Sequence, residues 1–78
     1  MVRASYTDSE GHRYEGFTVN GKKHGKGKLL FEDGAFYEGE FKHDQINGKG
    51  TLYYQENQPA YEGFWVNGQF HGEGILYN

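Results

Sequence analysis

The residues of this chain that could do chemistry recur at regular intervals. The tripeptide Tyr-Glu-Gly occurs three times and places carboxylates at Glu15, Glu38 and Glu62. Two carboxylates can act together in acid–base catalysis, as in glycosidases, where the pair lies about 5 to 9.5 Å apart. In a stack of hairpins, equivalent residues lie two strands apart, which is roughly 10 Å at about 4.8 Å per strand. We therefore expect a solvated row of glutamates, no catalytic residues and no enzyme.

Histidines are the residues best suited to hold a metal, and the chain has four: His12, His24, His43 and His71. It has no cysteine and no His-x-x-x-His pair. His24 and His71 are equivalent residues two repeats apart, or roughly 19 Å at about 4.8 Å per strand. Zinc ligands lie about 2.1 Å from a shared metal. The recurring Gly-x-Gly pairs lack the Lys and Ser/Thr of a phosphate-binding loop. We therefore expect no metal site and no cofactor.

A cluster of lysines forms the main charge feature of a chain whose net charge is −3. The segment KKHGKGK contains Lys22, Lys23, Lys26 and Lys28. Each basic residue near an anionic membrane is worth about 1 kcal/mol, so the cluster indicates one function, a peripheral membrane module that binds acidic phospholipids through Lys22–Lys28. The same cluster could instead be a solvated loop edge. Glutamates interrupt the basic face, so we expect no nucleic-acid binding.

The elements that hold these residues are predicted to be strands. Within each unit, side chains alternate with a period of two, so Tyr61, Gly63 and Trp65 share one face. A helix is disfavoured because each interior glycine costs about 1 kcal/mol relative to alanine, and the chain has 13 glycines. Asn20-Gly21 and Asn67-Gly68 are turn-forming pairs. Each unit is therefore a hairpin. Its glycines allow the tyrosine rings to lie flat over the backbone.

The repeat defines the predicted fold as all-β, a single-layer antiparallel meander of stacked β-hairpins with about seven strands. A chain of 78 residues is at most one small domain. We divide this single domain, 1–78, into a partial repeat at 6–13, repeats at 14–36 and 37–60, and a repeat lacking its tail at 61–78. A Gly-x-Gly pair follows each Tyr-Glu-Gly tyrosine by 11 residues and keeps the units in phase.

The segment YEGFWVNGQFHGEG, residues 61–74, resembles the MORN (membrane occupation and recognition nexus) repeat. The shared features are the Tyr-x-Gly head, the aromatic residue two positions later, the Asn-Gly turn and the His-Gly-x-Gly segment. Two residues depart from the pattern: Thr18 replaces the aromatic residue, and Asn47 replaces the histidine. The resemblance implies an elongated, twisted solenoid of hairpins without catalysis. Such arrays occur in scaffold proteins of cilia, radial spokes, cell-division structures and membrane junctions.

A single-layer sheet leaves apolar residues uncovered, and exposed apolar patches mark interaction sites. The leading hypothesis is therefore a non-catalytic scaffold protein that binds a protein partner through its aromatic face. The residues expected to bind the partner are Tyr14, Tyr37, Phe41, Tyr61 and Trp65. The opposite face offers a second set of apolar residues, Phe17, Val19, Phe64 and Val66.

The last expectations concern the C-terminal segment and the location of the protein in the cell. The segment GILYN stops just after a strand, and a bare strand edge pairs readily with another chain. We expect Ile75, Leu76 and Tyr77 to pair with a partner or to allow end-to-end self-association. The sequence shows neither a signal peptide nor an apolar run of about 20 residues. We expect a cytoplasmic protein, and the resemblance places it in a cytoskeletal or ciliary assembly, part of a larger complex.

Overall fold

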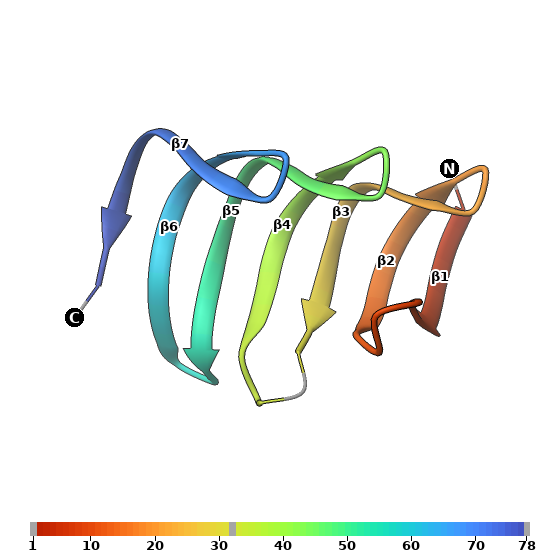
Figure 1. Ribbon diagram of the computed structural model, residues 1–78, viewed down its shortest axis with the longest axis horizontal. Coiled ribbons are helices and arrows are strands. Elements are labelled where there is room, and N and C mark those ends of the chain that lie inside the picture. The colour runs from red at the N-terminus through yellow and green to blue at the C-terminus, as the bar shows by residue number, and fades with distance from the viewer. Residues whose placement is uncertain (1, 32, 78) are drawn as a thin grey trace.

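Seven strands make up the sheet in the computed structural model, which describes residues 2–31 and 33–77. The strands are β1 (Val2–Thr7), β2 (Arg13–Val19), β3 (Lys22–Leu30), β4 (Phe36–Lys42), β5 (Gln45–Gln55), β6 (Gln58–Val66) and β7 (Gln69–Leu76). Their order in the sheet is their order in the chain, and every pairing is antiparallel (Figure 1). The described residues include no helix, and so none that could cross a membrane. The predicted all-β meander is confirmed.

The hairpins turn at three equivalent pairs of residues. Asn20-Gly21 joins β2 to β3, and Asn67-Gly68 joins β6 to β7; all four residues have positive φ, between 52° and 80°. Positive φ at both central residues is the mark of a type I′ turn, which matches the twist of the adjoining strands. His43-Asp44, between β4 and β5, has the same backbone with φ of 51° and 72° but no glycine. This turn is therefore the most strained of the three.

A row of glycines crosses the sheet and explains the second glycine of each Gly-x-Gly pair. The ladder pairs Gly16 with Gly27, Gly39 with Gly50, and Gly63 with Gly74, and Gly27 and Gly50 join the neighbouring repeats. A Cβ atom on Gly50 would lie 2.6 Å from a ring carbon of Tyr37, and one on Gly27 equally close to the ring of Tyr14. The tyrosine rings lie against bare backbone, as the alternation predicted.

The first glycine of each pair has a different role that the sequence reasoning missed. The register shifts between Gly16 and Thr18, and it shifts again at the same place in the other two repeats. The extra residues of each bulge include Gly25, Gly48 or Gly72, all with φ between 69° and 108°. Bulges with a left-handed residue favour glycine. In each Gly-x-Gly pair, the first glycine therefore belongs to the bulge, and the second leaves room for a tyrosine ring.

The core lies on one side of the sheet, here called the tyrosine face because it carries Tyr14, Tyr37 and Tyr61. The ring centroids of Tyr37 and Trp65 are 5.4 Å apart, and those of Tyr37 and Phe41 are 5.2 Å apart, both edge to face. Such pairs add about 0.5 to 1.5 kcal/mol each beyond burial. The buried cluster contains Tyr14, Leu29, Tyr37, Phe41, Tyr61 and Trp65. The opposite side, which carries Glu15, Glu38 and Glu62, is the glutamate face.

Candidate binding site

Two adjoining hollows, of about 670 and 250 Å³, lie on the tyrosine face and form one continuous depression, here called the trough. Both hollows are lined by Glu10 and His12 from the β1–β2 loop, by Phe31 after β3, by Ile46 of β5 and by Gly68 of the β6–β7 turn. Loops from both ends of the strands therefore contribute to its walls. Pockets of roughly 300 to 1,000 Å³ with mainly apolar linings are typical of binding sites.

The five aromatic residues predicted to bind a partner belong to the buried core cluster, and two of them, Phe41 and Trp65, line the trough. Their exposed fractions run from 0% for Tyr14 and Tyr37 to 5% for Tyr61. The structure thus brings all five together, as core residues with little surface of their own. Whether they take part in binding stays a prediction.

The side chains that a partner would touch first are different ones. Phe31, Ile46 and Leu52 are half-buried, pack on the core cluster and line the trough. Phe70 stacks on the Tyr61 ring with centroids 4.1 Å apart, yet 52% of it is exposed. The sequence reasoning missed these residues. The repeat held a signal for two of them, because Ile46 and Phe70 each follow a Tyr-Glu-Gly tyrosine by nine residues.

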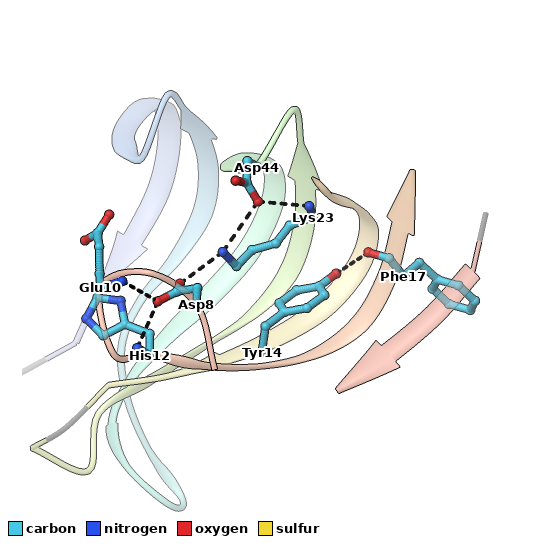
Figure 2. A network of polar contacts seen from close by, with 7 residues as sticks. All are labelled: Asp8, Glu10, His12, Tyr14, Phe17, Lys23 and Asp44. Carbon is cyan, nitrogen blue, oxygen red and sulfur yellow. Dashed lines mark hydrogen bonds and ion pairs between the residues drawn. The ribbon is translucent and has the colours of Figure 1, made fainter. Parts of the chain in front are cut away.

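The residue at this position in the first repeat is Lys23, which is 5% exposed. Its ammonium group lies 3.0 Å from a carboxylate oxygen of Asp8 and 3.5 Å from one of Asp44. It also lies 5.6 Å from the centre of the Tyr14 ring and 5.8 Å from that of Tyr6. Figure 2 shows Asp8 reaching this lysine from the β1–β2 loop. Lys23 thus fastens that loop to the β4–β5 turn.

Backbone groups complete the network around Lys23. The amide of Lys23 donates to the Asp44 carboxylate at 3.0 Å, and the amide of Asp44 donates to the Lys23 carbonyl at 2.9 Å. The other oxygen of Asp8 accepts from the amides of Glu10 and His12 at 3.0 and 2.9 Å (Figure 2). A buried charge is tolerated when it is paired and hydrogen-bonded in this way.

These contacts decide the ionisation of the network. Burial lowers the pKa of Lys23, but the hydrogen bond to Asp8 and the charge of Asp44 outweigh it, so the net shift is upward. Burial raises the pKa of Asp8, but hydrogen bonds from Lys23 and two backbone amides outweigh it and lower the net pKa. Burial also raises the pKa of Tyr14, to about 12. At neutral pH the network is an ion pair beside a neutral phenol.

A comparison with known protein families matches the MORN repeat model at three consecutive segments, residues 14–36, 37–57 and 61–77. Each segment begins at a Tyr-Glu-Gly tyrosine. The chain belongs to the MORN-repeat family. MORN repeats are non-enzymatic modules that generally mediate protein or lipid interactions. The family thus supports a protein- or membrane-binding module and does not specify a partner.

The lysines Lys22 to Lys28 do not share one surface of this MORN sheet. Lys22 and Lys26 are exposed, whereas Lys23 is buried in the trough. The ammonium group of Lys28 lies 4.5 Å from the centre of the Phe36 ring. The fold therefore leaves two of the four lysines fully available to an anionic ligand.

Acidic residues also surround the lysines of the glutamate face. Lys28 is paired in register with Glu15 on one side and Glu38 on the other, and Lys26 is paired with Glu40. A shallow hollow of about 480 Å³ on this face is lined by Arg3, Lys26, Lys28 and Lys49, and by Glu15, Glu38 and Glu40. These charges nearly cancel. The same register places Glu15 and Glu38 two strands apart, as the spacing of the repeat predicted.

Two further sets of candidate residues have distinct surroundings in the MORN sheet. Ile75 and Leu76 are 56% and 70% exposed, and Tyr77 donates a hydrogen bond to Glu62 at 2.8 Å. Their pairing with another chain stays a prediction. Of the histidines, His24 and His43 come nearest, with ring centroids 6.1 Å apart. Among residues 2–31 and 33–77, no three side chains of the metal-binding types come together.

Proposed function

We propose that this MORN-repeat protein is a non-catalytic scaffold module that holds a segment of a partner protein in its trough. The observation that carries the proposal is the half-buried apolar lining of the trough, formed by Phe31, Ile46 and Leu52 packed on the buried aromatic cluster. A partner segment would cover these side chains, which a single-layer sheet leaves open to water. Rigid aromatic anchors surrounded by residues that exclude water are typical of tight interfaces.

The test compares charges placed on the two faces of the sheet. Ile46→Asp puts a carboxylate in the trough, and Val66→Asp puts one on the glutamate face, where Val66 is 39% exposed. Partners are captured from extract at about 0.3 M salt, where the Debye length is near 6 Å and lysine-driven contacts are screened. We expect one partner to be held by wild type and Val66→Asp but lost with Ile46→Asp. The partner is then purified and titrated directly against the three proteins.

Folding is checked by circular dichroism, because a half-buried carboxylate can destabilise the sheet. Phe31→Ser, at a half-buried residue just beyond β3, serves as a second trough variant. Partners that bind both trough variants as well as they bind wild type would refute the trough as the binding surface.

Acidic-lipid binding through Lys22–Lys28 is the alternative function, and the exposed Lys22 and Lys26 favour it. Two exposed lysines provide about 1 kcal/mol each near an anionic membrane, which is weak. The test is flotation with vesicles containing about 30% phosphatidylserine, at low and at high salt, because screening abolishes this attraction. Salt-sensitive flotation that Lys22→Ala with Lys26→Ala removes, while the trough variants retain it, would favour the lipid function.

We also propose that the protein works in the cytoplasm, within a cytoskeletal or ciliary assembly. The support is the kind of scaffold protein in which MORN arrays are found. A fluorescent fusion expressed in ciliated cells tests the location. A diffuse signal, unchanged by the Ile46→Asp substitution, would argue against assembly through the trough.

A further inference from the structure

The walls of the trough carry most of the net charge of the protein. Four carboxylates line it, those of Asp8, Glu10, Asp33 and Asp44, against the single ammonium group of Lys23. Four negative charges and one positive charge leave −3, which equals the formal net charge of the whole chain. On the glutamate face the hollow is nearly neutral by comparison. The apolar side chains that line the trough are therefore surrounded by an excess of negative charge.

Lys23 pairs with two of these carboxylates, those of Asp8 and Asp44, and this network keeps one negative charge. The other two negative charges of the excess lie on Glu10 and Asp33. Both residues are exposed, and both line the hollow that also contains Ile46, Leu52 and Trp65. An apolar surface beside uncompensated acidic groups is complementary to a ligand that has apolar and basic side chains together.

The protein itself shows how such a surface accepts a lysine. The Lys23 ammonium group rests near the faces of two tyrosine rings and between two carboxylates. It occupies the repeat position that Ile46 and Phe70 fill farther along the tyrosine face. Aromatic faces and carboxylates together are an effective receptor for a cation. The trough thus contains an internal example of the contacts that a basic ligand residue would make.

We infer that the partner segment bound in the trough is basic and amphipathic. Its lysine or arginine side chains pair with Glu10 and Asp33, and its apolar side chains cover Phe31, Ile46 and Leu52. This inference rests on the proposed function, since it names the chemical class of the segment that the trough holds. It also predicts that acidic segments are rejected, because like charges across an interface are repulsive.

A displayed library of random peptides tests the inference without knowledge of the natural partner. Peptides of about 12 residues are long enough, since an extended residue spans about 3.3 Å and the longest dimension of the protein is 36 Å. Peptides are selected on the wild-type protein in the presence of excess soluble Phe31→Ser protein, which loses an apolar side chain of the trough without gaining a charge, so that binders that need the apolar lining are retained. We expect these binders to carry a net positive charge with apolar residues interspersed.

The charge contacts are then measured with one selected peptide. Glu10→Gln combined with Asp33→Asn removes the two uncompensated carboxylates and leaves the Lys23 network intact. The matched control, Glu38→Gln with Glu73→Gln, makes the same charge change at exposed residues outside the trough. We expect about fivefold weaker binding with the trough pair at low salt, as for exposed ion pairs, and no comparable change with the control pair.

The outcomes separate the two claims. Trough-dependent peptides that are neutral or acidic, or basic peptides that bind both double variants equally well, would overturn the inference and leave the proposed function standing. A selection that yields no trough-dependent peptide would count against the proposed function itself, and the inference would fall with it. Circular dichroism of Phe31→Ser confirms that the competitor is folded, and Ile46→Ser replaces it if it is not.

Discussion

At the two ends of the tyrosine face, equivalent positions hold opposite kinds of side chain. In β2 and β3, Thr18 is paired in register with Lys23, whereas in β6 and β7, Trp65 is paired with Phe70. Thr18 and Lys23 are nevertheless 7% and 5% exposed, whereas Trp65 is 4% and Phe70 is 52% exposed, so the polar end is the better covered of the two. The fold therefore tolerates either chemistry beyond the bulge, and this position is where repeats of one architecture can differ in what they bind.

Thr18, Lys23 and Trp65 are buried by different physical means. The Thr18 hydroxyl donates to the Val2 carbonyl at 3.0 Å, and Lys23 is held by its two ion pairs. Trp65 is held by ring contacts with Tyr37 and Tyr61, and its indole nitrogen donates to the Gly50 carbonyl at 3.1 Å. Hydrogen bonds and ion pairs hold the first end, whereas ring packing together with one hydrogen bond holds the other.

The largest expected effect comes from side-chain truncation to alanine at the same repeat position at each end of the tyrosine face. Trp65→Ala removes a buried indole and should lower the free energy of unfolding by about 3 to 5 kcal/mol, as for other large-to-small changes in a core. Thr18→Ala loses one hydrogen bond and should cost about 1 kcal/mol. Urea denaturation followed by tyrosine fluorescence measures both variants. Equal losses would mean that packing and hydrogen bonding support the two ends alike.

Glycine substitutions test whether the centre of the sheet is more constrained than its end. Gly50→Ala places a methyl group against the Tyr37 ring in a strand paired on both sides, and should cost about 1 to 3 kcal/mol, as for overpacked cores. Gly74→Ala crowds Tyr61 in the same way, but all of β7 is exposed and can shift. We expect a smaller loss for Gly74→Ala by thermal denaturation. The reverse order would show that the last hairpin is the rigid one.

The next effect on stability is expected when the polar end is converted into an apolar one. Lys23→Ile introduces the side chain found at Ile46 but leaves two carboxylates without their cation. It should lower the free energy of unfolding by about 2 kcal/mol, less than the loss of a fully buried pair, because Asp44 is half-exposed. Adding Asp8→Asn and Asp44→Gly removes those charges, and we expect the triple variant to regain most of the loss. Chemical denaturation of the single and triple variants decides the matter. A triple variant no more stable than Lys23→Ile would mean that the carboxylates were not the source of the cost.

The uneven success of the sequence reasoning follows from the same comparison. The hairpins, their turns and the tyrosine–glycine contacts could be predicted because they depend on a local period of two and on residues repeated in register. The burial of Lys23 could not, because its partner Asp8 lies 15 residues away, in the partial repeat at 6–13 that precedes the first Tyr-Glu-Gly unit. The alternation could group the five aromatic residues on one face, but it could not predict which side chains of that face are buried and which contact solvent. That difference follows from the packing of Ile46 and Leu52 against the aromatic cluster.

Acid should affect the polar end first. The pKa of Asp8 is lower in the folded state than its ordinary value of 3.8, so folding favours the ionised form. The stability that this provides is present above about pH 4 and is lost as the pH falls through the folded pKa. Asp8→Asn should therefore be less stable at neutral pH and show a shallower decline in acid. Denaturation curves recorded between about pH 2 and 7 measure the free energy of unfolding of both proteins. A parallel decline of this free energy in wild type and variant would contradict the prediction.

The smallest expected effect lies in the turn between the two ends. His43 has the same positive φ as Asn20 and Asn67, and histidine is less favourable there than asparagine, so His43→Asn should stabilise the protein by about 0.5 kcal/mol. Asp44→Gly relieves strain at the next residue in the same way. It also removes the carboxylate that accepts the Lys23 amide and pairs with the Lys23 ammonium group. We therefore expect a gain for His43→Asn but a net loss for Asp44→Gly, measured by thermal denaturation. A gain for both would mean that turn geometry outweighs the ion-pair network at the polar end of the tyrosine face.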